Sequence, residues 1–176
     1  MTETEVLFNG RWLRLSRRGR WEFAERTNPG GGVIIVAVTP ENRLLLVEQW
    51  REALRSKTIE LPAGLVGDDD GGEGETAATA AARELDEETG YVAAHVEFLM
   101  AGPSSAGMSN EIISVVRATG LTRRGGEPEE GIVVHEVPLD EVPRWLAARM
   151  AEGYAIDPKL FAGLYFLDHP DALKSP

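Results

Sequence analysis

The chain has 176 residues, of which 43% are hydrophobic, a size and composition typical of a single globular domain with a packed core. Its net charge of −11 disfavours nucleic acid and anionic membranes as partners, and no stretch is long and apolar enough to span a membrane. The absence of cysteine excludes disulfides and thiolate chemistry. Since the N-terminus is acidic and lacks a signal-peptide pattern, we expect a cytoplasmic protein.

The first half of the chain predicts mainly strands. Residues 6–27 contain short alternating stretches separated by turns with glycine, so two or three antiparallel strands are expected. Residues 33–38 and 44–47 are rich in β-branched and apolar side chains and flank a Pro-Glu-Asn turn, which predicts a hairpin. A short strand is expected at residues 58–64, followed by a polar, glycine-rich loop at residues 66–75.

An alanine-rich segment from Thr76 to Thr89 predicts a helix. Thr76 or Glu75 is suited to its N-cap, and Gly90 stands where a left-handed residue usually ends a helix. Two further strands are expected at residues 96–102 and 110–119.

The C-terminal third predicts one loop, one strand and two helices. Residues 120–131 form a polar loop, and residues 132–139 a strand. Amphipathic helices are expected at residues 139–153 and 157–169, the second with Asp157 as N-cap and Pro158 at its first position. Strands interrupted by one helix and closed by C-terminal helices indicate a mixed α/β sandwich.

Acidic residues crowd the end of the expected mid-chain helix, at Glu84, Asp86, Glu87 and Glu88. Like charges on a helix repel, and acids near its C-terminus oppose the macrodipole, so a bound cation is expected to compensate. Glu84 and Glu88 share one helical face and Glu87 lies at its edge, which suits Mg²⁺ or Mn²⁺. Arg83 can brace the cluster. The alternative is a solvated acidic face.

This segment resembles the box of the Nudix hydrolases, which reads Gly, five residues, Glu, seven residues, then Arg-Glu-apolar-x-Glu-Glu-x-Gly-apolar. The chain has Glu75, seven further residues, and then the sequence Arg-Glu-Leu-Asp-Glu-Glu-Thr-Gly-Tyr at residues 83–91. Asp69 stands where the glycine is expected, so we assign that glycine to Gly64 and a longer loop to the residues between. This loop is either a surface insertion or an acidic element near the substrate or metal.

The flanking segments resemble ADP-ribose pyrophosphatases and related nucleotide-sugar hydrolases. The segments are residues 47–64, 102–119, 129–142 and 153–160. The resemblance covers residues 5–168 and implies an α/β fold, with a Nudix-type α/β/α sandwich and mixed sheet at residues 31–176. It also implies a small N-terminal antiparallel β subdomain at residues 1–30 that packs across a homodimer.

The implied activity is metal-dependent hydrolysis of the diphosphate bond of ADP-ribose or a related nucleotide sugar to a nucleoside monophosphate and a sugar phosphate. By the resemblance, Glu84, Glu88 and the carbonyl of Ala63 bind Mg²⁺ or Mn²⁺. Glu87 is a ligand through water or an orienting group, and Arg83 holds the motif together.

The general base is expected in the acidic loop at residues 125–131, because carboxylates bound to metal are poor bases. We prefer Glu130, with Glu129 and Glu127 left open, and a solvated charge run is the alternative. No histidine has metal-ligand spacing, so all three are assigned structural roles.

Four residues are candidates for substrate binding. Arg51 can clamp a phosphate with two hydrogen bonds, and Glu111 occupies a typical acidic position of the family. Trp21 and Trp50 are candidates for stacking on adenine, with core packing as the alternative. Two other functions remain open: hydrolysis of GDP-mannose or a dinucleoside polyphosphate, and sensing of ADP-ribose without hydrolysis, which the intact glutamates disfavour.

Overall fold

The computed structural model describes residues 3–27, 30–67 and 74–173. Residues 67–72, expected to be either a surface insertion or an acidic element near the substrate or metal, lie outside the described residues except for Gly67. The first strands are β1 (Thr4–Asn9), β2 (Leu13–Arg18), β3 (Trp21–Arg26), β4 (Gly32–Ala37), β5 (Arg43–Arg51), β6 (Ser56–Glu60) and β7 (Ala63–Leu65). After α1 (Ala77–Thr89) follow β8 (Tyr91–Val92), β9 (His95–Pro103), β10 (Ile112–Thr119), β11 (Thr122–Arg123) and β12 (Val133–Pro138). A 3₁₀ turn (Leu139–Glu141), α2 (Val142–Ala151), β13 (Ala155–Ile156) and α3 (Lys159–Asp168) complete the described chain.

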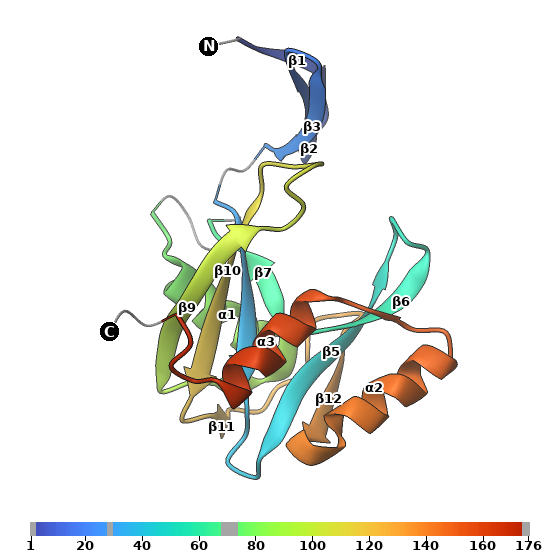
Figure 1. Cartoon of the computed structure of the whole chain (residues 1–176). Helices are drawn as coiled ribbons and strands as arrows, with labels where there is room; N and C mark the ends of the chain where they lie inside the picture. Colours follow the sequence, from blue (N-terminus) through green and yellow to red (C-terminus); the bar gives the residue numbers. More distant parts are fainter. Residues whose placement is uncertain (1–2, 28–29, 68–73, 174–176) are drawn as a thin grey trace.

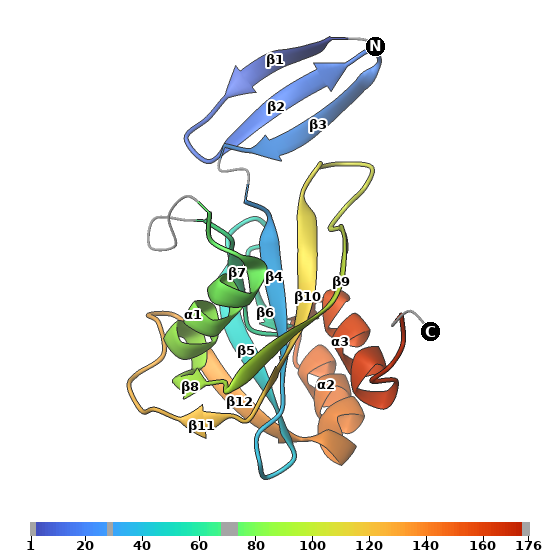
Figure 2. The same cartoon turned by 90° about the vertical axis from the view of Figure 1, so that its left-hand side faces the viewer.

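The N-terminal strands form a separate antiparallel sheet in the order β1-β2-β3, as expected. This sheet stands above the other elements in Figures 1 and 2. It meets the β9–β10 loop, where the Ala24 N–H donates to the Met108 carbonyl over 2.8 Å.

Two four-stranded sheets make up the centre of the molecule. One has the order β7-β4-β10-β9, with β4 and β10 parallel, and the other has the order β12-β5-β6-β13, with β6 and β13 parallel. Both sheets therefore mix parallel and antiparallel pairs.

The expected hairpin between β4 and β5 is wrong. The turn exists, and the Thr39 N–H donates to the Arg43 carbonyl over 2.8 Å, but Val38 and Leu44 form only an isolated bridge before the strands diverge into different sheets. The physical reason is that β4 is buried on both faces, so it lies in the middle of a sheet between β7 and β10.

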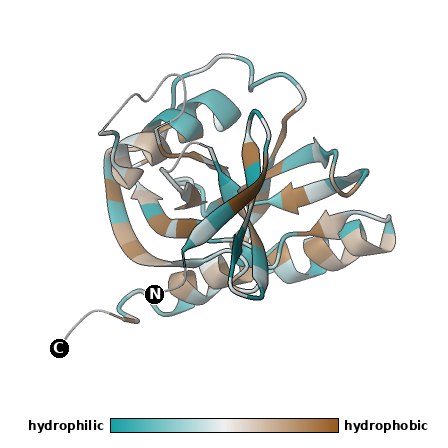
Figure 3. Ribbon diagram, turned by 90° about the horizontal axis from the view of Figure 1, so that it is seen from above, coloured by the Kyte–Doolittle hydropathy of each residue, from teal (hydrophilic) through white to brown (hydrophobic). Residues whose placement is uncertain are grey.

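Helices cover both sides of the sheets and confirm the α/β/α sandwich. Val33, Ile35 and Leu45 pack with Leu85 of α1, whereas Ile34 and Val36 pack in a second core cluster with residues of α2 and α3. This division follows from the two-residue period of a strand. Figure 3 shows the hydrophobic colour concentrated along strands between the helical layers.

The helix ends agree with the sequence at α1 and differ at α3. Thr76 caps α1 by accepting from the Thr79 N–H, and Gly90 ends it with φ 71°. The helix α3 starts at Lys159, one residue later than expected, although the Asp157 carboxylate still accepts the Lys159 N–H over 2.9 Å. No helix in the described ranges has the length and apolarity needed to cross a membrane.

Candidate active site

The strand β7 lies so close to α1 that position 64 has no room for a side chain. A Cβ built on Gly64 would be 1.8 Å from Cδ of Glu84. The neighbouring Ala63 N–H donates to Oε2 of Glu88 over 2.9 Å. Glu84 and Glu88 are both buried, so β7 presses directly on two carboxylates that share one helical face.

Arg83 connects this face with the segment that precedes the helix. Its Nη1 donates to Glu84 over 2.8 Å and to Glu87 over 3.0 Å, and its Nε donates to Glu75 over 3.2 Å. Its Nη2 also donates to the Leu65 carbonyl over 3.1 Å. Arg83 therefore holds the carboxylates of α1 against β7, the bracing position expected from the sequence.

The carboxylates leave a surplus of negative charge at the end of α1. Burial raises the pKa of Glu88 to about 8; the charges of Glu84 and Glu129 add to this rise, whereas the Ala63 N–H and Arg51 oppose it. Carboxylate and carbonyl oxygens are ligands that Mg²⁺ and Mn²⁺ prefer, so these side chains fit a divalent cation. Within the described residues, however, no three acidic or histidine side chains already form a complete metal cluster.

The acidic loop reaches the same end of α1. The Glu129 N–H donates to the Glu87 carbonyl over 3.0 Å, and Arg124 pairs with Asp86 over 2.6 Å. Glu127, Glu129 and Glu130 are all exposed, but Glu129 is the one whose charge acts on Glu88.

A cavity of about 310 Å³ is lined by Ala63 and Gly64, the two residues of β7 that contact Glu88 and Glu84. The polar residues that line it are Arg26, Arg51, Glu60, Ser104, Glu111 and Lys159. Arg51 donates to both oxygens of Glu60 through Nε and Nη2, each over 2.7 Å. The structure thus brings Arg51, Ala63 and Glu111 together, as expected.

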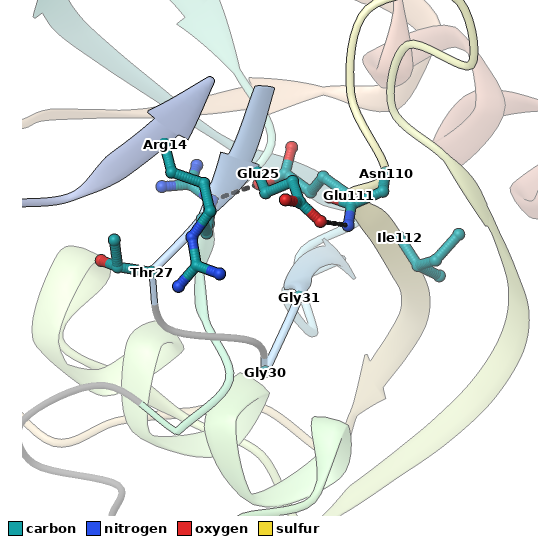
Figure 4. Close-up of a pocket in the computed structure, with 9 residues that line it drawn as sticks. Arg14, Glu25, Thr27, Gly30, Gly31, Asn110, Glu111 and Ile112 are labelled. Carbon is teal, nitrogen blue, oxygen red and sulfur yellow. Dashed lines mark hydrogen bonds and ion pairs between the residues drawn. The ribbon is translucent and has the colours of Figure 1, made fainter. Parts of the chain in front are cut away.

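A second cavity, of about 340 Å³, shares Arg26 and Glu111 with the first (Figure 4). Arg26 donates to Glu111, and Asn110 donates to Glu25 over 2.9 Å, so two side-chain pairs tie β3 to the start of β10. Burial raises the pKa of Glu111, but hydrogen bonds from Arg26 and Ser104 outweigh this effect and leave the pKa below its usual value.

Comparison with known proteins identifies the family of the chain. The NUDIX domain matches residues 28–159. The chain belongs to the Nudix family. The ADP-ribose pyrophosphatase of Bacillus subtilis is 32% identical over 181 residues, which cover 97% of this chain and 93% of that protein. The methanol dehydrogenase activator of Bacillus methanolicus is 31% identical over 182 residues, which cover 98% and 94% of the two chains. A crystal structure of an ADP compounds hydrolase has the same fold, with a TM-score of 0.72 at 19% identity, over 96% of this chain and 91% of that chain.

The two candidate tryptophans do not line the cavity of about 310 Å³ that contains Arg51. Trp21 lies 62% exposed in a third cavity, of about 360 Å³, together with Phe23 and Asn110. Trp50 is 52% exposed and donates through Nε1 to Glu52 over 2.9 Å. Core packing, the alternative for both residues, is therefore wrong.

Sequence reasoning missed Arg26, Glu60 and Lys159 as cavity residues. Glu60 lies opposite Val47 in the β5–β6 pair, and residue spacing alone does not give this register or the bonds of Glu60 to Arg51. Two histidines make contacts within the protein: His135 bonds Glu48 over 3.0 Å and packs at a tilt against the ring of Trp145, and His169 contacts the Tyr165 carbonyl.

Proposed function

We propose that this Nudix protein hydrolyses the diphosphate bond of ADP-ribose or a closely related nucleotide sugar, giving a nucleoside monophosphate such as AMP and a sugar phosphate such as ribose 5-phosphate. The observation that carries the proposal is the contact of β7 with Glu84 and Glu88 beside a cavity that contains Arg51. The similarity to the Bacillus subtilis ADP-ribose pyrophosphatase over nearly the whole chain supports the choice of substrate.

Glu84, Glu88 and the Ala63 carbonyl would hold Mg²⁺ or Mn²⁺, with Glu87 as a further ligand or orienting group. Such a cation neutralises phosphate charge and lowers the pKa of bound water. Arg83 holds the Glu84 carboxylate by a hydrogen bond, Gly64 leaves room for that carboxylate, and the Ala63 N–H holds Glu88. The substrate therefore meets an acidic surface, and hydrolysis of the anionic diphosphate there would need the cation.

Glu60 accepts two hydrogen bonds from the Nε and Nη2 atoms of Arg51, which fixes the direction in which the guanidinium points. The guanidinium N–H groups that Glu60 does not use suit a phosphate. We assign Arg51 to orient one phosphate through them, in the cavity that Glu111 and Arg26 also line.

The general base is assigned to the acidic loop, and Glu129 is a stronger candidate than Glu130. The Glu129 backbone is bonded to the end of α1, and its charge acts on Glu88, so its side chain belongs to the neighbourhood of the carboxylates. Its exposure leaves it outside the buried cluster and able to take a proton from the attacking water.

The experiment that tests this proposal replaces the helix carboxylates singly. Glu84→Gln and Glu88→Gln are each expected to reduce turnover of ADP-ribose with Mg²⁺ by at least about 100-fold while the fold is kept. Asp86→Asn is the matched control, because Asp86 lies on the same helix but pairs with Arg124. Turnover that survives both glutamine variants would refute the assignment.

The active form is proposed to be a homodimer assembled through the N-terminal sheet. Several large apolar side chains on β1–β3 and their turns are exposed, with Phe8 at 67% and Trp12 at 62%. A three-stranded sheet with such an exposed face is stabilised by a partner surface. Sedimentation at micromolar concentration should give twice the chain mass of 19.2 kDa, and a single-chain mass would contradict the dimer.

The protein is proposed to act in the cytoplasm, in keeping with a sequence without cysteine. Fractionation of the source cells should recover it with cytoplasmic markers, and recovery with the membrane or the medium would contradict this location.

A further inference from the structure

The first turn of α3 reaches the cavity that contains Arg51 because β13 pairs with β6. In this parallel pair Ile156 lies opposite Ile59, and the Asp157 N–H donates to the Ile59 carbonyl over 3.0 Å. The chain then turns into α3 at Lys159, whose side chain lines the cavity together with Arg51 and Glu111.

Each cation of this cavity is paired with one carboxylate, in the pairs Arg26–Glu111, Arg51–Glu60 and Lys159–Asp157. These pairs differ in how firmly the cation is held. Arg51 makes two parallel bonds to Glu60, which is nearly buried. Lys159 makes one contact, of 2.5 Å, to Asp157, and its side chain is 41% exposed.

Lysine has a flexible stem and a compact charge, so it can change partners at lower cost than a doubly bonded guanidinium. The charge of Lys159 already acts inside the cavity, because it helps to lower the pKa values of both Glu60 and Glu111. Lys159 is therefore within electrostatic reach of Glu60 and Glu111, and all three residues line the space where an anionic substrate would enter.

We propose that Lys159 binds substrate by moving its ammonium group from Asp157 to a phosphate of the diphosphate. This inference rests on the proposed function for the identity of the substrate. It makes Lys159 a substrate-binding residue with its effect mainly on KM, and it gives Asp157 the role of holding the ammonium group at the cavity until an anion arrives. Lys159 on α3 would then neutralise part of the diphosphate charge, in addition to a divalent cation that the carboxylates of α1 would hold.

The test measures equilibrium binding of ADP-ribose in the presence of excess chelator, so that turnover does not interfere. Lys159→Met is expected to raise Kd about tenfold, the effect of losing one charge-assisted hydrogen bond. Binding of uncharged adenosine should not change. With Mg²⁺, KM should rise by a similar factor and kcat should stay within about twofold of the wild type.

Two further variants separate binding from a structural role. Asp157→Asn keeps a side-chain oxygen for the α3 cap but removes the competing charge, so it should bind ADP-ribose more tightly than the wild type. Lys57→Met is the matched control, because Lys57 also pairs with a carboxylate, Glu48 over 2.6 Å, but does not line the cavity.

Wild-type affinity in Lys159→Met, or equal weakening in Lys159→Met and Asp157→Asn, would overturn the inference. If thermal melting shows that Lys159→Met does not fold, Asp157→Asn decides alone, and binding no tighter than that of the wild type overturns the inference. If the wild type fails to hydrolyse ADP-ribose, the proposed function falls. Inorganic pyrophosphate then replaces ADP-ribose as the binding probe, with the same expected order of affinities.

Discussion

Replacing Gly64 by alanine perturbs the site through a single atom. The new Cβ would lie 1.8 Å from Cδ of Glu84 and 2.0 Å from its Oε1. Ordinary carbon–carbon contact needs about 3.5 Å, so the carboxylate has to move by about 1.7 Å, the difference between 3.5 and 1.8 Å. A displacement of 1 Å in a catalytic group costs about 100-fold in rate, so kcat should fall by at least that factor.

Stability should change much less than activity. Overpacking costs about 1–3 kcal/mol, which a domain with about 5–15 kcal/mol of stability tolerates. The Gly64→Ala protein should therefore fold, melt a few degrees lower and show weaker dependence of its rate on Mg²⁺. The assay combines thermal melting with initial rates over a Mg²⁺ titration.

Gly107→Ala is the control, because its Cβ would meet nothing within 4 Å. The reasoning is refuted if Gly64→Ala keeps near wild-type kcat and the same Mg²⁺ dependence as the control.

Three further predictions concern other parts of the chain. Burial raises the pKa of Glu48, but hydrogen bonds from Lys57 and His135 outweigh this effect and leave the pKa below its usual value. The ionised Glu48 therefore contributes to stability above about pH 4.5, and this contribution is lost as the pH falls through the lowered pKa. Glu48→Gln should cost about 1–3 kcal/mol of unfolding free energy at pH 7 and less at pH 3, and equal costs in urea titrations at both values would contradict this. Glu129→Gln should lower kcat at least tenfold with KM nearly unchanged, whereas Glu130→Gln should not; the reverse order in steady-state kinetics would move the base to Glu130. Asn110→Ala should loosen the N-terminal sheet by removing its bond to Glu25, seen as faster hydrogen exchange in β3 with α1 unaffected, and unchanged exchange in β3 would argue against this tie.

Local features were predictable from the sequence because their causes are local. Thr76 and Gly90 mark the ends of α1 through contacts within one helical turn, and the spacing of Glu84 and Glu88 places both on one face. The hydrogen bonds of Arg83 to Glu84 and Glu87 are local in the same way, because all three residues lie within one turn of the helix. The N-terminal sheet was predictable for a similar reason, since its strands are neighbours in sequence.

Features that depend on pairing between distant strands were not predictable. The segments of β4 and β5 read as a hairpin, yet β4 pairs with β10, which lies far along the chain. Lys159 reaches the cavity only because β13 joins β6, and Arg26 reaches it only because β3 meets the start of β10. Strand alternation also did not reveal which sheet face Trp50 would occupy.

Competition between substrates, with the products resolved, tests the central claim most directly. ADP-ribose, a nucleoside triphosphate and a diadenosine polyphosphate are offered together with Mg²⁺, and in parallel with excess chelator. The account predicts that ADP-ribose is consumed fastest, that AMP and ribose 5-phosphate appear in equal amounts, and that the chelator abolishes the reaction. A clear preference for the triphosphate, or an undiminished rate in chelator, would contradict it.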